Sequence, residues 1–129
     1  VQQIPSLSEI NKKDFKVLIA EDNDSNFSLV QHILFKYNLT RVKNGVEALE
    51  KLHNEQYDII LMDMKMPIMG GLEAVRKIRE FDTKVPIIAL TAYAFDSDRT
   101  SAMEAGCNAF LTKPLNKSQL LGLFSTKYQ

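Results

Sequence analysis

Three short apolar runs constrain the fold of this chain more than any other feature. They are FKVLIA at 15–20, YDIILM at 57–62 and VPIIAL at 85–90, and each run ends at polar residues. Continuous apolar runs of this length are typical of strands buried on both faces, and such strands belong to parallel sheets. Two weaker runs at similar spacing, 39–43 and 107–112, complete a prediction of five strands.

Helical patterns separate the predicted strands. In the first three intervals, apolar residues recur every three or four positions, so that they share one face of a helix. These stripes are Phe27, Val30 and Leu34, then Val46, Leu49 and Leu52, then Leu72, Val75 and Ile78. The segment 95–105 has a weaker helical pattern and ends at Gly106, while Asn116 is suited to cap a last helix. The alternation predicts a three-layer, doubly wound α/β domain with ligands beyond the carboxyl ends of its strands.

The composition limits what such a domain can do. The chain has 129 residues, enough for one domain, and 16 basic and 16 acidic residues give it a net charge of zero, which disfavours direct binding to nucleic acid or to a membrane surface. The sequence contains no run of about 18 apolar residues, the length needed to span a membrane. The single cysteine, Cys107, cannot form an internal disulfide, so we expect a cytoplasmic domain in which this thiol is buried.

The amino-terminal segment differs from the rest of the chain. Residues 1–14 are polar and aperiodic, and we interpret them as a linker or leader before a domain at 15–129. The first residue is Val rather than Met, so we expect the sequence to be a piece of a longer chain.

Side chains that can carry chemistry stand at four predicted strand ends. Glu21 and Asp22 follow the first run, Asp63 the third, Thr91 the fourth and Lys113 the fifth. Because the carboxyl ends of parallel strands meet at one edge of a sheet, we expect three carboxylates to converge there. They would repel one another unless a cation binds or a proton is retained.

Mg²⁺ is the cation that fits this edge best, because it prefers hard oxygen ligands and commonly bridges carboxylates to a phosphoryl group. His32 and His53 lie on predicted helices away from the edge, so no site for a softer metal competes. Each strand-end residue alone has an ordinary explanation as a helix cap or a turn residue. Their joint occurrence favours a site for Mg²⁺ and phosphate, with Lys113 as the fixed counter-charge.

These motifs resemble those of the receiver domains of two-component response regulators. The match runs from Phe15 to Phe124 and comprises Glu21-Asp22-Asn23, LMDMKMPIMGG at 61–71, LTA at 90–92, KP at 113–114, and Phe110 three residues before the lysine. The resemblance implies a flavodoxin-like fold with strand order 2-1-3-4-5. It also implies that the domain accepts a phosphoryl group from a histidine kinase or a histidine phosphotransfer domain and then switches conformation.

The resemblance implies a role for each acidic residue. Asp63 would be the phosphoacceptor, with its carboxylate as the nucleophile. Asp22, Asp63 and the backbone carbonyl of Lys65 would ligate Mg²⁺, and Glu21 would assist directly or through a water. The family often has Asp in place of Glu21, so this chain carries a variant at that position.

The resemblance also implies roles for the remaining site residues. Lys113 and the Thr91 hydroxyl would each bind a phosphoryl oxygen, and Pro114 would form a cis-proline turn that aims the lysine inward. Thr91 and Phe110 would carry the conformational switch, although Phe110 can equally be a core aromatic in both states.

Two further residues would set the lifetime of the phosphoryl group, since Lys65 and Tyr93 occupy positions that flank the path of the attacking water in receivers. We expect the bulk of Tyr93 to slow hydrolysis. The domain would then promote its own phosphorylation and dephosphorylation, and the parent chain could be a histidine kinase.

Other readings of the same residues stay open or are disfavoured. A haloacid-dehalogenase-like phosphatase needs an acid two residues after its nucleophile, where this chain has Lys65. A flavodoxin-like electron carrier needs a Ser-, Thr- or Gly-rich loop after the first strand, where this chain has Glu21-Asp22-Asn23-Asp24, whose carboxylates would repel a phosphate. A receiver-like module that binds partners without phosphorylation stays open.

The parent protein is also a matter of resemblance. The motifs and the polar leader resemble the C-terminal receiver of a hybrid sensor histidine kinase, which could be membrane-anchored. The alternative is a stand-alone or effector-fused response regulator. The resemblance further implies that the domain can form a homodimer. The contact surface would be formed by residues 95–105, 107–112 and 117–124.

Overall fold

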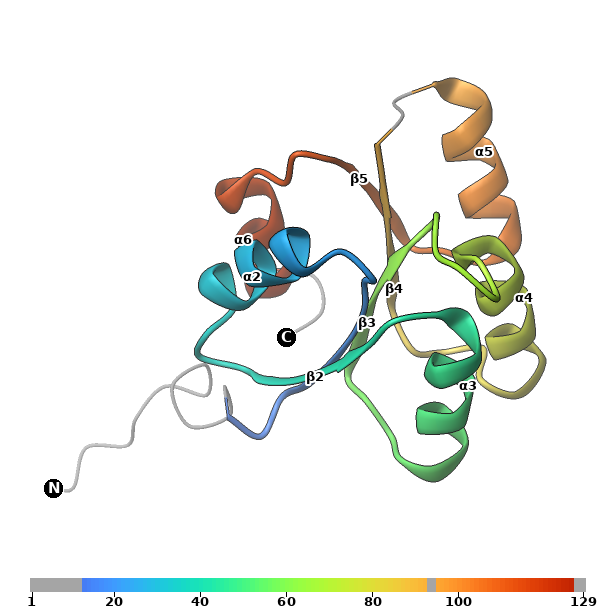
Figure 1. The fold of residues 1–129 in the computed structure, drawn as a ribbon, viewed down its shortest axis with the longest axis horizontal. Coiled ribbons are helices and arrows are strands. Elements are labelled where there is room, and N and C mark those ends of the chain that lie inside the picture. The colour runs from blue at the N-terminus through green and yellow to red at the C-terminus, as the bar shows by residue number, and fades with distance from the viewer. Residues whose placement is uncertain (1–12, 93–94, 127–129) are drawn as a thin grey trace, which may run out of the picture.

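The protein, described by a computed structural model over residues 13–92 and 95–126, is built on five parallel strands in the order β2-β1-β3-β4-β5. Helices α2 and α6 cover one face of the sheet, and α3, α4 and α5 cover the other (Figure 1). The predicted doubly wound, three-layer α/β domain and its strand order are therefore confirmed. The elements are β1 (Lys16–Ala20), α2 (Asp24–Ile33), β2 (Asn38–Val42), α3 (Gly45–Asn54), β3 (Ile59–Asp63), α4 (Gly71–Phe81), β4 (Ile87–Thr91), α5 (Asp96–Ala105), β5 (Ala109–Thr112) and α6 (Lys117–Thr126).

Strands β3 and β4 each extend one residue beyond their apolar runs. Asp63 and Thr91 are the last residues of β3 and β4, as predicted, although both are polar. The reason is that hydrogen bonds rather than hydrophobicity decide where a strand ends. Met64 N–H donates to Leu90 O at 2.9 Å, and Lys113 N–H donates to Thr91 O at 2.7 Å, so the ladder continues into the polar residues.

One expectation about the fifth strand is wrong. The apolar pattern placed Cys107 in a strand at 107–112, but β5 begins at Ala109. The Cys107 N–H instead donates to Ala102 O at 3.0 Å and closes the end of α5, where Gly106 adopts a φ of 121°. The expected burial of Cys107 is confirmed, with 5% of the residue exposed.

Asparagine side chains begin three of the helices. Asn23 and Asn44 accept hydrogen bonds from backbone N–H groups in the first turns of α2 and α3, at 2.9 Å each. Asn116 accepts in the same way from Gln119 N–H at 3.0 Å, so its expected role as the cap of α6 is confirmed. The expected weak helix at 95–105 is α5, which has no side-chain cap. In the described part of the chain, no helix has the length and apolar character needed to cross a membrane.

The apolar core lies on both faces of the sheet because every residue of β3 and β4 is buried. On the α2–α6 side, the rings of Phe15, Tyr37 and Phe124 contact one another, with centroids 5.1 to 6.0 Å apart. Edge-on aromatic contacts of this kind add about 0.5–1.5 kcal/mol to the energy of simple burial. This cluster closes the edge of the domain at which β1 begins, and the opposite edge carries the polar strand ends.

Methionines fill the core around β3. Met62 is fully buried, and Met64, Met66 and Met69 pack against the core cluster on the α3–α5 side. The flexible thioether side chain suits such irregular space. Core filling therefore accounts for the run of methionines, and Met103 on α5 is the more exposed one, at 44%.

Candidate functional site

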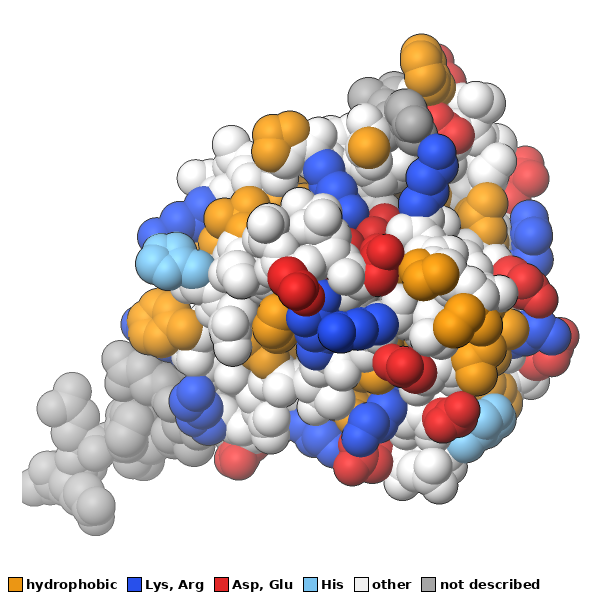
Figure 2. Space-filling view, in the orientation of Figure 1, with side chains coloured by type: hydrophobic (Ala, Val, Ile, Leu, Met, Phe, Trp, Pro, Cys, Tyr) orange, Lys and Arg blue, Asp and Glu red, His pale blue; other side chains and the backbone are white. Residues whose placement is uncertain are grey.

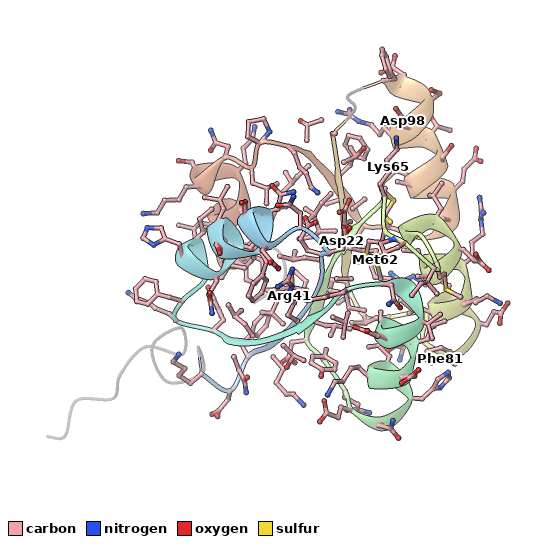
Figure 3. The ribbon with its side chains drawn as sticks, in the orientation of Figure 1. Asp22, Arg41, Met62, Lys65, Phe81 and Asp98 are labelled. Carbon is pink, nitrogen blue, oxygen red and sulfur yellow. The ribbon has the colours of Figure 1, made fainter. Side chains whose placement is uncertain are left out.

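The three acidic residues predicted to converge do so at the carboxyl edge of the sheet. Glu21 and Asp22 directly follow β1, and Asp63 ends β3. One carboxylate oxygen from each lies within 4.8 Å of the others. Figure 2 shows acidic side chains in a hollow near the centre of the viewed face, with basic side chains close by, and Figure 3 labels Asp22 at this place.

All of the strand-end residues line one pocket of about 220 Å³. Its walls combine carboxylates, two lysines and a threonine, and it is open to solvent on the side of Asp22, which is exposed. The lining residues are Glu21, Asp22, Asn23, Asn26, Asp63, Lys65, Thr91, Ala92 and Lys113. Residues from the ends of four strands and from the start of α2 thus meet in one small polar cavity.

Lys113 lies between two buried carboxylates. Its Nζ is 2.8 Å from Glu21 Oε1 and 3.0 Å from Asp63 Oδ2. The Glu21 side chain is fully buried, and that of Asp63 is 6% exposed. Although Glu21 Oε1 is close to the ammonium, it makes no well-formed hydrogen bond within the described residues. A buried carboxylate oxygen without a full set of partners is a strong acceptor for a cation.

Burial and neighbouring charge alter the ionisation of this pair. Burial raises the pKa of Glu21, and the adjacent Asp63 raises it further. Burial alone would lower the pKa of Lys113, but pairing with Glu21 and Asp63 outweighs this effect and raises it. Lys113 is therefore held as a cation, whereas the ionised form of Glu21 is disfavoured until more positive charge arrives.

Local backbone contacts orient the two buried carboxylates. Asn23 N–H donates to Glu21 Oε2 at 3.2 Å, and Lys65 N–H donates to Asp63 Oδ1 at 3.1 Å. Gly71 begins α4 against the carbonyl of Asp63, where a Cβ would lie only 2.3 Å from the oxygen. A side chain at position 71 would therefore displace the backbone that carries Asp63.

The two residues expected to switch lie on neighbouring strands. Thr91 is 6% exposed at the end of β4, and Phe110 is half-buried on β5 and packs against the core. Both line a second cavity, of about 180 Å³, between the end of β3 and α5. The Arg99 guanidinium lies 5.5 Å from the centre of the Phe110 ring.

The peptide bond between Lys113 and Pro114 is cis. Tyr93 lies outside the described residues.

Sequence reasoning missed one residue that contacts the acidic loop, Arg41 on β2. Its Nε donates to the backbone carbonyl of Glu21 at 3.0 Å, and its Nη1 forms an ion pair with Asp24 at 2.9 Å. The signal in the sequence was a lone arginine inside the short apolar run at 39–43. His32 and His53 lie on α2 and α3, away from the site, as expected.

The donor set fits Mg²⁺. Three carboxylates supply hard oxygen ligands, and no histidine or cysteine accompanies them in the described pocket. Two of the carboxylates are buried and one is exposed, which leaves room for water ligands that this ion retains.

Comparison with known proteins identifies the family. Residues 17–124 match the response regulator receiver domain, and the chain belongs to this family. It is 40% identical over 123 residues to hybrid signal transduction histidine kinase I of Dictyostelium discoideum. This alignment covers 87% of this chain and 7% of the relative. It is also 38% identical over 125 residues to transcription factor SKN7 of Candida albicans, in an alignment that covers 95% of this chain and 22% of that relative. The chain thus spans only a small part of these relatives.

Solved structures agree with this assignment. The receiver domain of sensor histidine kinase PA1611 from Pseudomonas aeruginosa, with a magnesium ion in its active-site cleft, has a TM-score of 0.78 and 37% identity, covering 84% of this chain and 92% of that one. A chain in the co-crystal of the Saccharomyces cerevisiae phosphotransfer protein Ypd1 with the Ssk1 receiver domain has a TM-score of 0.81 and 33% identity, covering 88% of each. The protein is a receiver domain of two-component signal transduction.

Proposed function

We propose that Asp63 accepts a phosphoryl group from a phosphohistidine on a histidine kinase or phosphotransfer domain. The observation that carries the proposal is the position of Asp63, at the end of β3 in an acidic pocket and 3.0 Å from the Lys113 ammonium. An oxygen of the Asp63 carboxylate attacks the phosphorus atom, the phosphorus–nitrogen bond breaks, and the leaving imidazole nitrogen keeps the electron pair. The product is an aspartyl phosphate.

The other pocket residues align and neutralise the group that is transferred. Lys113 pairs with one phosphoryl oxygen, and the Thr91 hydroxyl donates to another. Asp22, Asp63 and the backbone carbonyl of Lys65 would hold Mg²⁺, with Glu21 assisting directly or through a water, and the proximity of the three carboxylates supports this set. The ion, when bound, supplies charge neutralisation for the phosphoryl oxygens.

We propose that phosphorylation changes the conformation of the domain through Thr91 and then Phe110. The cavity that both residues line gives the Phe110 ring space to move when Thr91 shifts toward a phosphoryl group. The surface of α5, β5 and α6 would then change, and we propose it as the homodimer interface. Phe95, which precedes α5, and Met103 on α5 are exposed, at 67% and 44%, and support an apolar contact there. Size-exclusion chromatography with and without phosphorylation tests the dimer.

Lys65 and Tyr93 are proposed to set the lifetime of the phosphoryl group. Lys65 lines both the acidic pocket and the cavity between the end of β3 and α5, which supports a place beside the reacting phosphorus. A Tyr93→Ala variant is expected to lose the phosphoryl group faster than wild type, and an equal or slower loss would overturn this role.

The proposed parent is a hybrid sensor histidine kinase with this domain as its receiver, acting in the cytoplasm. Two hybrid signal transduction histidine kinases of Dictyostelium discoideum and a sensor kinase/phosphatase of Vibrio vulnificus, all similar to this chain, support it. The second candidate, a response regulator, is favoured by the 35% identity to the polar-differentiation response regulator DivK of Brucella anthropi, over 85% of that protein. A kinase ATPase domain in the full-length sequence would decide for the hybrid kinase.

The central test is incubation of the domain with Mg²⁺ and acetyl phosphate or a phosphorylated histidine donor, followed by intact mass measurement. Wild type should gain about 80 Da, the mass of one phosphoryl group. Asp63→Asn should gain nothing, and Asp96→Asn, which removes an exposed carboxylate from the first turn of α5, should be labelled like wild type. An unlabelled wild type, under conditions that label another receiver, would refute the proposal.

A further inference from the structure

Arg41 connects the edge strand β2 to the loop that carries the acidic pair. Its Nε–H donates to the backbone carbonyl of Glu21 at 3.0 Å, and its Nη1 lies 2.9 Å from Asp24 Oδ1. The Cζ atom of the guanidinium lies over the Phe27 ring, 4.6 Å from its centre. Figure 3 labels Arg41 below Asp22 on the viewed face. One side chain thus contacts the first residue of the loop after β1 and the first turn of α2.

The geometry points to Arg41 as a positioning residue for the metal site, which fixes the peptide group between Glu21 and Asp22 and so sets where both carboxylates face Asp63. This inference rests on the proposed magnesium site and adds to it a residue outside the pocket. Arg41 does not line the pocket and acts only through the loop.

The hydrogen bonds of Glu21 show why this contact matters. Glu21 N–H donates to Val42 O at 3.0 Å, and Glu21 O accepts from Arg41, so that β2 holds both polar groups of the Glu21 backbone. Asp22 comes next in the chain, and its side chain is exposed. Its direction therefore depends on the backbone that Arg41 fixes. Residues that orient metal ligands in this way typically change metal affinity by about 10- to 100-fold when removed.

The contacts of Arg41 contribute little to the stability of the folded domain. The Asp24 side chain is 83% exposed, and ion pairs with such exposed partners contribute little. The Nη2 of Arg41 is buried without a hydrogen-bond partner in the described part of the chain, which opposes folding. Replacing Arg41 by Met keeps an apolar side chain over Phe27 and leaves Asp24 in water. We therefore expect an Arg41→Met variant to fold.

The loss of charge and the loss of loop positioning should change the Mg²⁺ affinity of Arg41→Met in opposite directions. The guanidinium is a cation near a cation-binding pocket, so charge alone predicts that its removal strengthens Mg²⁺ binding. Positioning predicts that the loop relaxes and Mg²⁺ binding weakens. The sign of the change therefore separates the two effects.

The experiment is a calorimetric titration of Mg²⁺ into the unphosphorylated domain, with thermal unfolding in EDTA as the measure of folding. Positioning predicts about tenfold weaker binding in Arg41→Met. Arg41→Lys keeps the charge but cannot serve Glu21 O, Asp24 and the Phe27 ring together, so it should weaken binding severalfold. Asp24→Asn keeps the bond to Glu21 O and should bind within about twofold of wild type.

The outcomes are distinguishable. Binding in Arg41→Met as tight as wild type or tighter would overturn the inference and leave the magnesium site in place. If Arg41→Met does not fold, Arg41→Lys decides, because unchanged affinity in that variant would equally overturn it. A wild-type domain that does not bind Mg²⁺ would refute the proposed metal site and the inference with it.

Discussion

The Nζ of Lys113 lies 3.0 Å from Oδ2 of Asp63, although both side chains are largely buried at the ends of different strands. The same ammonium lies 2.8 Å from Glu21. The proposed nucleophile is therefore paired with a cation before any phosphoryl group arrives. Because that cation is held by the fold, it needs no reorganisation when a phosphoryl group enters the pocket.

Removing this cation should slow phosphorylation and strengthen metal binding. In Lys113→Met, the labelling rate with acetyl phosphate should fall by at least about tenfold, because a fixed charge on the phosphoryl oxygens is lost. Mg²⁺ should bind more tightly, because a competing positive charge leaves the carboxylates. Intact mass time courses and calorimetry measure the two effects. Lys117→Met, at an exposed lysine on α6, is the control and should change neither.

Replacing Glu21 should stabilise the metal-free domain. Burial and Asp63 raise the pKa of Glu21, so its contribution to stability is lost as the pH rises through that pKa. Glu21→Gln avoids the buried charge, and we expect a gain of about 1 kcal/mol in the free energy of unfolding at neutral pH. The gain should shrink in acid, where Glu21 itself is protonated. Urea unfolding in EDTA at several pH values measures it, and a loss of stability at neutral pH would contradict the argument.

Position 71 should not tolerate a side chain. A Cβ on Gly71 would lie 2.3 Å from Asp63 O and 2.6 Å from Met64 Cε, so either α4 or the end of β3 must move. We expect Gly71→Ala to lose about 2–3 kcal/mol of unfolding free energy. Gly122→Ala is the matched control, because a Cβ there would meet no described atom within 4 Å beyond its own stretch of helix. In helix α6 this control should gain up to about 1 kcal/mol. Urea unfolding of both variants provides the comparison.

Cys107 should be chemically inert in the folded domain. Burial raises the pKa of its thiol to about 11, so the reactive thiolate is scarce at neutral pH. A chromogenic disulfide reagent should leave it unmodified at about pH 8 in the native state and modify it fully in denaturant. Rapid reaction of the native protein would show that α5 and the segment before β5 open readily.

The sequence was most informative where the structure depends on a repeating pattern. The apolar runs predicted the sheet because a parallel strand must be covered on both faces, and the meeting of Glu21, Asp22 and Asp63 followed from the parallel order. The placement of Cys107 in a strand was wrong because one apolar residue at a run's edge does not reveal its hydrogen bonds. The role of Arg41 was missed because its contacts join β2 to a loop about 20 residues earlier, which no local pattern encodes.

The contact between the Phe15 and Phe124 rings has a consequence for how the domain can be joined to other parts of a protein. The centroids of these rings are 6.0 Å apart, at the edge where β1 begins, opposite the edge that holds Asp63. Polypeptide attached before Phe15 or after Phe124 thus departs from neighbouring points on the far side of the domain. Both of these points therefore lie away from the acidic pocket at the carboxyl ends of the strands.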